Sequence, residues 1–229
     1  MKPGSYDVIP TWSVQVGDTE TTGLSASDDR ICSFWFQKLD WDEDAGFWKR
    51  GLEIKSLINP GCPIPEAAAK VNGFTWQPGG APTIDGRVNL YYAPRFEDIA
   101  SELRGVLGNT PLVFHNSVFD AAFIDRELER AGEPKLDQLT ICTKKAFSDI
   151  QGLGRPNHYI PGTNLNTLCK TLDIDTSGRF LNGQELHGAE VDGKLAVQAF
   201  EKLYNLSWLV AEDVSHLPHR NPSLSFPSP

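Results

Sequence analysis

The fold assignment rests on the stretch TWSVQVGDTETTGL, residues 11–24. Its first six residues alternate polar and apolar side chains, which predicts a β-strand over 11–18. Because residues i and i+2 of a strand point to the same face, Asp18 and Glu20 are expected to project together. Carboxylates held this close either raise one another's pKa or bind a cation, and divalent metals prefer such oxygen ligands.

Length and composition indicate one main domain. The chain has 229 residues, of which 40% are hydrophobic and 22% charged, enough to build a single large core. Residues 214–229 are rich in Ser, Pro and His and show no periodicity, so we interpret them as a tail. We therefore expect a domain over 1–213 followed by that tail.

The charge and the cysteines narrow the class of protein. A net charge of −9 argues against a surface that grips nucleic acid throughout, although a local site neutralised by metal remains open. The cysteines are scattered, which is typical of reduced thiols: Cys32, Cys62, Cys142 and Cys169. The chain shows no export signal and no apolar run of about 18 residues. We expect a soluble cytoplasmic protein with no membrane partner.

The order of elements predicts an α/β fold. Three strands at 11–18, 31–40 and 46–58 open the chain as an antiparallel meander, the last two joined by a hairpin turn. Further expected elements are a helix at 65–70, a long Gly/Pro-rich loop at 73–94, a helix at 95–108, a strand at 111–116, a helix at 119–132, a weaker strand-and-helix pair within 136–147, and helices at 164–172 and 189–210. This order favours a central mixed sheet with helices on both faces.

Two later segments add polar groups that suit the same site. Asp120 falls in the first turn of a helix just after a buried strand, where the helix dipole favours a carboxylate even without a functional role. His187 precedes Asp192 by five residues, about 500° on a continuous helix, so the two side chains would diverge by about 140°. If both serve one site, His187 must lie in a loop before the helix.

Three motifs in register resemble one known family. They are D-x-E-T-T-G-L at 18–24, H-N-x-x-F-D at 115–120 and H-G-A-x-x-D at 187–192. In this order they resemble the exonuclease motifs of the DEDDh (DnaQ-like) family, with most likeness to the proofreading ε subunit of bacterial DNA polymerase III. The resemblance covers about residues 11–206, and one motif alone would be weak evidence. It implies a ribonuclease H-like fold with a five-stranded mixed sheet.

The resemblance also implies roles. Four acids would hold two Mg²⁺ or Mn²⁺ ions, and His187 would act as general base; the acids are Asp18, Glu20, Asp120 and Asp192. Hydrolysis of a phosphodiester by two cations about 3.5 to 4 Å apart requires hard oxygen ligands, and a histidine with a pKa of about 6.5 suits a base at neutral pH. Contacts to the terminal nucleotide are implied for Thr19, Leu24, Val71, Asn72, His115, Asn116 and Phe119.

The sequence departs from its relatives in several places, and two of these departures bear on nucleotide contacts. Many proofreading relatives carry histidine where this chain has Asn72, which puts one nucleotide contact in doubt. The loop at 73–94 is longer than usual in the family, and its aromatic residues either stack on unpaired bases or pack on one another, the second being slightly favoured.

The leading hypothesis is a metal-dependent 3′–5′ exonuclease that trims or proofreads single-stranded DNA and releases nucleoside 5′-monophosphates. An exoribonuclease is the alternative within the class, because the motifs do not choose the sugar. A catalytically silent nucleic-acid-binding subunit is the alternative of another class. Expected partners are DNA 3′ ends and a replicative polymerase. A sliding clamp is a weaker candidate, because SLSFP at 223–227 only loosely resembles peptides that dock on clamps.

Overall fold

The computed structural model describes residues 13–81, 86–150, 162–181, 184–185 and 187–209. Its centre is a five-stranded sheet of order β3-β2-β1-β6-β7, and the first three strands form the predicted meander. The strands are β1 (Ser13–Thr21), β2 (Ile31–Asp42), β3 (Phe47–Leu57), β6 (Leu112–Phe114) and β7 (Thr140–Cys142). β6 lies parallel to both β1 and β7, so the sheet is mixed, as predicted.

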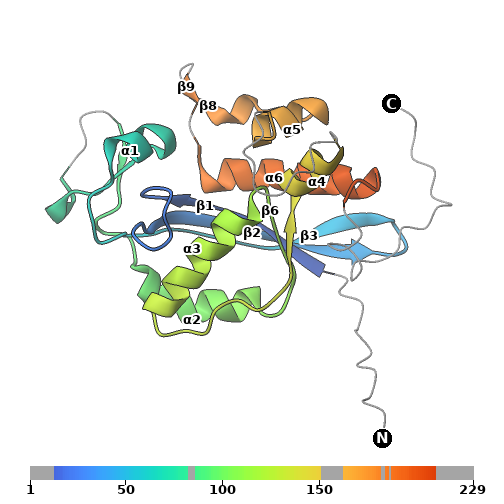
Figure 1. Ribbon diagram of the computed structural model, residues 1–229. Helices are drawn as coiled ribbons and strands as arrows, with labels where there is room; N and C mark the ends of the chain where they lie inside the picture. Colours follow the sequence, from blue (N-terminus) through green and yellow to red (C-terminus); the bar gives the residue numbers. More distant parts are fainter. Residues whose placement is uncertain (1–12, 82–85, 151–161, 182–183, 186, 210–229) are drawn as a thin grey trace, which may run out of the picture.

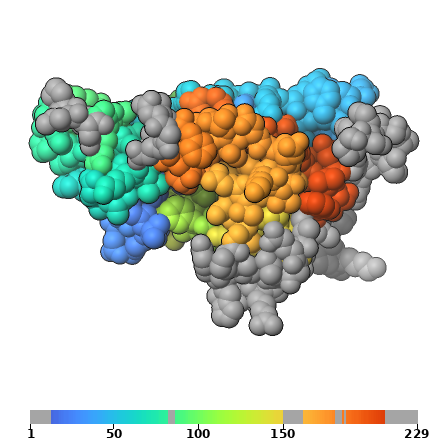
Figure 2. All heavy atoms as spheres, turned by 90° about the horizontal axis from the view of Figure 1, so that it is seen from above, coloured from blue at the N-terminus to red at the C-terminus, as the bar shows by residue number. Residues whose placement is uncertain are grey.

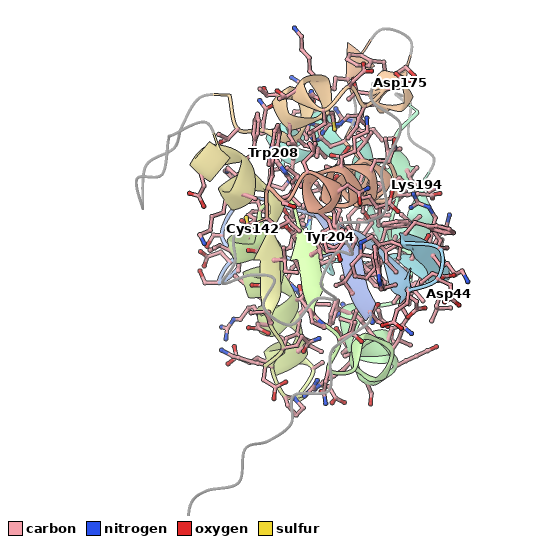
Figure 3. All side chains as sticks on the ribbon, turned by 90° about the vertical axis from the view of Figure 1, so that its right-hand side faces the viewer. Asp44, Cys142, Asp175, Lys194, Tyr204 and Trp208 are labelled. Carbon is pink, nitrogen blue, oxygen red and sulfur yellow. The ribbon has the colours of Figure 1, made fainter. Side chains whose placement is uncertain are left out.

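Helices cover both faces of the sheet (Figure 1). One face carries α4 (Thr143–Ile150), α5 (Leu165–Thr171) and α6 (Ala189–Asn205), and the other carries α2 (Phe96–Leu107) and α3 (Ser117–Arg130). The end-on view in Figure 3 shows the same layers, with Tyr204 of α6 over the strands. Two apolar cores result, one on each side, because every central strand is buried on both faces.

β1 divides its side chains between these two cores. Val14 and Val16 are fully buried against the α6 side. Gln15 points to the other side, where its amide Nε2 donates to the carbonyl oxygens of Val106 and Leu107 in α2, 2.9 and 3.2 Å away. The two-residue period therefore aims the even-numbered residues at α6 and the odd-numbered ones at α2 and α3.

A smaller unit lies beside the carboxyl end of β1, where Asn72 contacts Thr21. It contains α1 (Glu66–Asn72), β4 (Phe74–Thr75), the 3₁₀ turn η1 (Pro78–Gly80) and β5 (Val88–Asn89). The expectation of a plain loop over 73–94 was wrong, because β4 and β5 pair in parallel. Trp76, Tyr91 and Tyr92 pack ring against ring there, with centroids 5.6 and 5.1 Å apart. The aromatic residues thus pack on one another, as the sequence slightly favoured.

The remaining elements lie before α6. They are the 3₁₀ turn η2 (Ser177–Arg179), β8 (Phe180–Leu181) and β9 (Gln184–Glu185), and β8 pairs antiparallel with β9. The sequence did not predict this excursion. The predicted helix at 189–210 was too long, since α6 ends at Asn205, where Ser207 takes a φ of 58° and the Trp208 N–H donates to the Leu203 carbonyl.

Some expectations lie outside the described residues, namely those for the tail at 214–229 and its SLSFP segment. Within the described ranges, no helix is both long and apolar enough to cross a membrane.

Candidate active site

Three acidic side chains meet at the carboxyl end of β1. One carboxylate oxygen from each of Asp18, Glu20 and Asp192 lies within 4.8 Å of the other two. Asp18 and Glu20 share a face of β1, as predicted, and that face looks toward α6, which carries Asp192 in its first turn. Since β1 and β6 are parallel, their carboxyl ends and the residues after β6 open at the same edge of the sheet.

Asp120 joins this cluster from the opposite face of the sheet. It lies in the first turn of α3 and is 4% exposed. Thr19, which points to the α3 side of β1, donates to Asp120 Oδ1 from its backbone N–H at 3.1 Å and from its hydroxyl at 2.8 Å. Burial raises the pKa of Asp120 to about 7, although these two hydrogen bonds lower it.

The strand acids are also shifted by burial and by one another. Burial, followed by the charges of Asp192 and Asp120, raises the pKa of Glu20 to about 8. The pKa of Asp18 is raised well above its ordinary range by burial and then by the charge of Asp120. Several carboxylates in one largely buried cluster resist ionisation, which is the electrostatic signature of a cation site.

His187 lies before α6, in the segment that ends at the helix N-cap Gly188. This confirms that it precedes the helix, and its Nδ1 is 3.1 Å from Asp192 Oδ2. Its Nε2 is 3.9 Å from Glu185 Oε1, and the side chain is 40% exposed. Nδ1 therefore lies within hydrogen-bond distance of Asp192, whereas the nearest described carboxylate to Nε2 is Glu185, beyond that distance.

A glycine lets α6 approach the sheet closely enough for Asp192 to reach Asp18 and Glu20. A Cβ built on Gly193 would lie 2.2 Å from the Trp35 ring of β2, far inside van der Waals contact. The helix backbone therefore rests directly on the indole ring, one residue beyond Asp192.

The acids lie in a cavity of about 990 Å³, which also contains all the predicted nucleotide contacts. Leu24 and Val71 are 88% and 45% exposed and form part of its mouth. Phe119 stacks near Phe123, with ring centroids 4.7 Å apart. Asn116 also lines the cavity, as the residue before α3. Figure 2 views the molecule from above and shows the teal α1 segment beside the orange segment of α5 and β9.

Three of the predicted contacts use their polar atoms inside the protein. Besides Thr19, the Asn72 amide donates to the Thr21 carbonyl at 3.1 Å and accepts from the Phe74 N–H at 3.0 Å. His115 places Nε2 3.0 Å from the Thr163 carbonyl and Nδ1 3.1 Å from the Thr143 hydroxyl. A carbonyl only accepts, so Nε2 carries the hydrogen, and burial lowers the His115 pKa to about 4. These residues fix the cavity walls.

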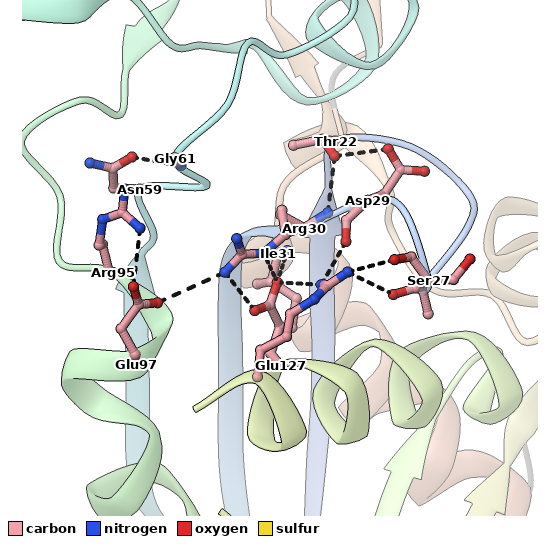
Figure 4. Close-up of polar contacts among 12 residues, drawn as sticks. Thr22, Ser27, Asp29, Arg30, Ile31, Asn59, Gly61, Arg95, Glu97 and Glu127 are labelled. Carbon is pink, nitrogen blue, oxygen red and sulfur yellow. Dashed lines mark hydrogen bonds and ion pairs between the residues drawn. The ribbon is translucent and has the colours of Figure 1, made fainter. Parts of the chain in front are cut away.

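The loop that carries Leu24 is held by a buried acid of α3 (Figure 4). Glu127, 1% exposed, accepts from Arg30 Nε at 2.7 Å and from Arg30 Nη2 at 2.9 Å, and also from the Ile31 N–H at 3.2 Å. Arg130 of the same helix donates to the Ser27 and Asp29 carbonyls of the loop. Helix α3 thus presents Asp120 at one end and anchors the β1–β2 loop at the other.

Arg179 is the residue that the sequence analysis missed. It is 3% exposed, and its Nη2 lies 2.6 Å from Asp192 Oδ2 and 2.7 Å from His187 Nδ1. Its only sequence signal is an arginine eight positions before His187, and neither its burial nor its partners can be read from that spacing.

Sequence relatives point to one family. No family model matches the chain. It is 31% identical over 180 residues to DNA polymerase III subunit epsilon of Buchnera aphidicola subsp. Acyrthosiphon pisum, covering 78% of this chain and 67% of that protein. The epsilon subunit of Rickettsia felis is 29% identical over 191 residues, covering 81% and 71%. The chain belongs to the DEDDh exonuclease family. It spans only 11% of a related PolC-type polymerase III from Oceanobacillus iheyensis.

Solved structures share the fold of this family. Escherichia coli exonuclease I, in a complex with single-stranded DNA, matches with a TM-score of 0.62 and 14% identity, covering 85% of this chain and 40% of that one. Exonuclease X, solved with a 5′-overhanging duplex, matches with a TM-score of 0.50 and 19% identity, covering 89% and 98%. At these identities the likeness concerns the ribonuclease H-like fold alone.

Proposed function

We propose that this protein is a metal-dependent 3′–5′ exonuclease that removes nucleotides from single-stranded DNA ends. The observation that carries the proposal is the convergence of Asp18, Glu20 and Asp192 on a space 4.8 Å across, with Asp120 bonded to the same strand through Thr19. Family membership supports the same reaction, since the epsilon relatives are subunits of DNA polymerase III by name.

The donor set fits hard divalent cations. All four acids offer carboxylate oxygens, which Mg²⁺ and Mn²⁺ prefer. Asp192 Oδ1 is buried and has no hydrogen-bond partner among the described residues, although Oδ2 of the same carboxylate is bonded. A buried anionic oxygen left without a donor is costly unless a cation completes it. Asp18, Glu20 and Asp192 would hold one ion, and Asp18 with Asp120 a second.

When bound, two such cations would supply positive charge that favours deprotonation of an attacking water and offsets charge on the attacked phosphate. The protein's own part is to hold the proton acceptor and the strand end. His187 would accept the water's proton on Nε2 in the tautomer whose Nδ1 carries the hydrogen and donates to Asp192 Oδ2; Arg179 Nη2, which can only donate, then bonds to Asp192 Oδ2 and not to Nδ1. Leu24, Val71 and Phe119 would pack against the terminal base and leave its phosphodiester over the acids.

An end-labelling experiment tests this function. A 5′-labelled DNA strand and its RNA counterpart are incubated with Mg²⁺ or Mn²⁺, and products are resolved by size. We expect a ladder shortened from the 3′ end with DNA, release of nucleoside 5′-monophosphates, and none of this in EDTA. Asp18→Asn should lower the rate at least about 100-fold, because it removes a ligand charge.

Asp28→Asn is the matched control, since Asp28 is exposed in the nearby β1–β2 loop and does not line the cavity. A ladder with RNA only would replace the DNA assignment by an exoribonuclease. Binding of DNA without cleavage under both metals would indicate a silent binding subunit instead.

The epsilon relatives also suggest a partner for this chain. We propose that it acts beside a DNA polymerase, because epsilon is a polymerase III subunit by name. Co-purification with a replicative polymerase subunit, measured for the full chain, tests this directly.

A further inference from the structure

A buried guanidinium links the described parts of the excursion between α5 and α6. Arg179 Nη1 donates to Asn166 Oδ1 of α5 and lies 3.1 Å from Glu185 Oε1 of β9. Its Nη2 faces Asp192 of α6 and His187 Nδ1. One planar group therefore connects a helix on each side of the excursion with two residues of the excursion itself, a geometry that a lysine ammonium cannot reproduce.

Charge explains why an arginine lies at this point. Asp18, Glu20, Asp120 and Asp192 share one buried cluster, and Arg179 is the cation whose charge opposes the raised pKa of both Asp18 and Glu20. It bonds to Oδ2 of Asp192, whereas Oδ1 has no hydrogen-bond partner among the described residues. Arg179 thus offsets part of the charge of the cluster and leaves one Asp192 oxygen for a cation.

Few other described contacts fix His187. Its backbone N–H donates to the Val71 carbonyl of α1 at 2.9 Å, and its side chain reaches Asp192 and Arg179 through Nδ1. Leading into it, Glu185 is held by Arg179 and by the Asn166 amide, which donates at 2.6 Å. Without the guanidinium, Glu185 loses its described link to α6, and His187 is left with its contact to Asp192 alone on that side.

From these contacts we propose that Arg179 is a positioning residue, which clamps His187 and Asp192 in the arrangement that the reaction needs. The inference rests on the proposed function for its catalytic consequence, but the clamp itself is a property of the metal-free protein. Arg179 also lines the cavity, and we assign its effect to its contacts with His187 and Asp192.

The test combines kinetics with hydrogen exchange. In Arg179→Gln we expect kcat to fall about 10- to 100-fold, as for other groups that orient ligands, with KM changed less than about threefold. In the metal-free variant the His187 amide should exchange at least about tenfold faster, while amides of β1 and β2 exchange at the rate of the parent protein. Arg179→Lys should recover less than half of the kcat that Arg179→Gln loses, because lysine keeps the positive charge but lacks the planar guanidinium with its several N–H donors.

Arg50→Gln is the control, because Arg50 pairs with Glu201 at the far end of α6 on the surface; it should leave kcat and exchange unchanged. If Arg179→Gln does not fold, Asn166→Ala removes one anchor of the clamp and should lower kcat and speed exchange at His187 in the same direction. Unchanged exchange at His187, or an unchanged kcat in an active protein, overturns the clamp. A parent protein without nuclease activity would refute the proposed function and leave the exchange result to decide the clamp.

Discussion

Thr19 and Asp120, 101 residues apart, are joined by two hydrogen bonds to one carboxylate oxygen. Thr19 lies on the face of β1 opposite to Asp18 and Glu20, so it reaches around the strand end to the helix on the other side. The strand thereby presents acids to α6 and a pair of donors to α3. This relationship explains how Asp120 is held beside the other acids although it belongs to the opposite layer.

Replacing Thr19 by valine should shift the pH dependence of the reaction upward. The change keeps the shape and the backbone donor but removes the hydroxyl, one of the groups that hold the raised pKa of Asp120 down to about 7. Less Asp120 is then ionised at neutral pH, so the cleavage rate should fall about 3- to 10-fold near pH 7 and recover toward pH 9. Rates measured from pH 6 to 9 check this.

Thr171→Val serves as the control for that profile, because its hydroxyl donates to the Thr167 carbonyl on α5. An unshifted profile in Thr19→Val would mean that the hydroxyl does not control the ionisation of Asp120.

The metal-free protein should lose stability as the pH rises. The Glu20 pKa is about 8 in the folded protein and about 4.3 in an unfolded chain, so the folded state binds more protons between these values. The free energy of unfolding therefore falls with rising pH, on the order of 1–2 kcal/mol between pH 6.5 and 8. The low pKa of His115, about 4, acts in the opposite direction but more weakly, because the unfolded ring with its ordinary pKa of about 6.5 is half protonated at pH 6.5; over this pH range it adds only about 0.4 kcal/mol to the stability. Urea unfolding in EDTA at the two pH values measures the difference.

Two further measurements extend the pH experiment, one with a variant of Glu20 and one with added metal. Glu20→Gln should flatten the decline, because the amide has no proton to lose. Excess Mn²⁺ should reverse it at pH 8, since an ion that binds only the folded state stabilises by mass action. A stability that rises from pH 6.5 to 8 in EDTA would contradict the raised pKa values.

Gly193→Ala should damage both stability and the site. The new methyl group would lie 2.2 Å from the Trp35 ring, so α6 must move outward and carry Asp192 with it. We expect a loss of about 1–3 kcal/mol from overpacking, and weaker Mn²⁺ binding by calorimetry. Gly105→Ala is the matched control, because Gly105 is an exposed position of α2 with open space around it; it should stabilise the protein by about 0.5–1 kcal/mol. Equal effects of the two substitutions would refute the packing argument.

Glu127→Gln should loosen the loop that carries Leu24. The neutral amide leaves the buried side of Arg30 without its charged partner, so we expect a loss of about 3 kcal/mol in unfolding free energy. Since Leu24 lies at the mouth of the cavity, KM for single-stranded DNA should rise about 3- to 10-fold through the less ordered loop. Glu129→Gln, in an exposed pair with Arg126 on the same helix, should change neither value. An unchanged KM in a destabilised Glu127→Gln variant would show that the order of this loop does not affect substrate binding.

Local patterns determined much of the fold. The alternation in β1, the glycine stops at Gly73 and Gly108 and the amphipathic spacing of α2 and α3 are set by neighbouring residues, so the sequence predicted them to within a few positions. The pairing of Asp18 with Glu20 on one face follows from the strand period alone. The order of the three motifs was enough to indicate the family.

Only the tertiary structure decided which strands pair and which side chains meet. The pairing of β4 with β5 and of β8 with β9 involves two-residue strands, too short to show a period. Arg179 could not be recognised because burial of a charge depends on partners from α5, β9 and α6 that meet only in the folded chain. Periodicity is a property of adjacent residues and can be read from the sequence, whereas a buried ion network is a property of separate elements and exists only once they have packed.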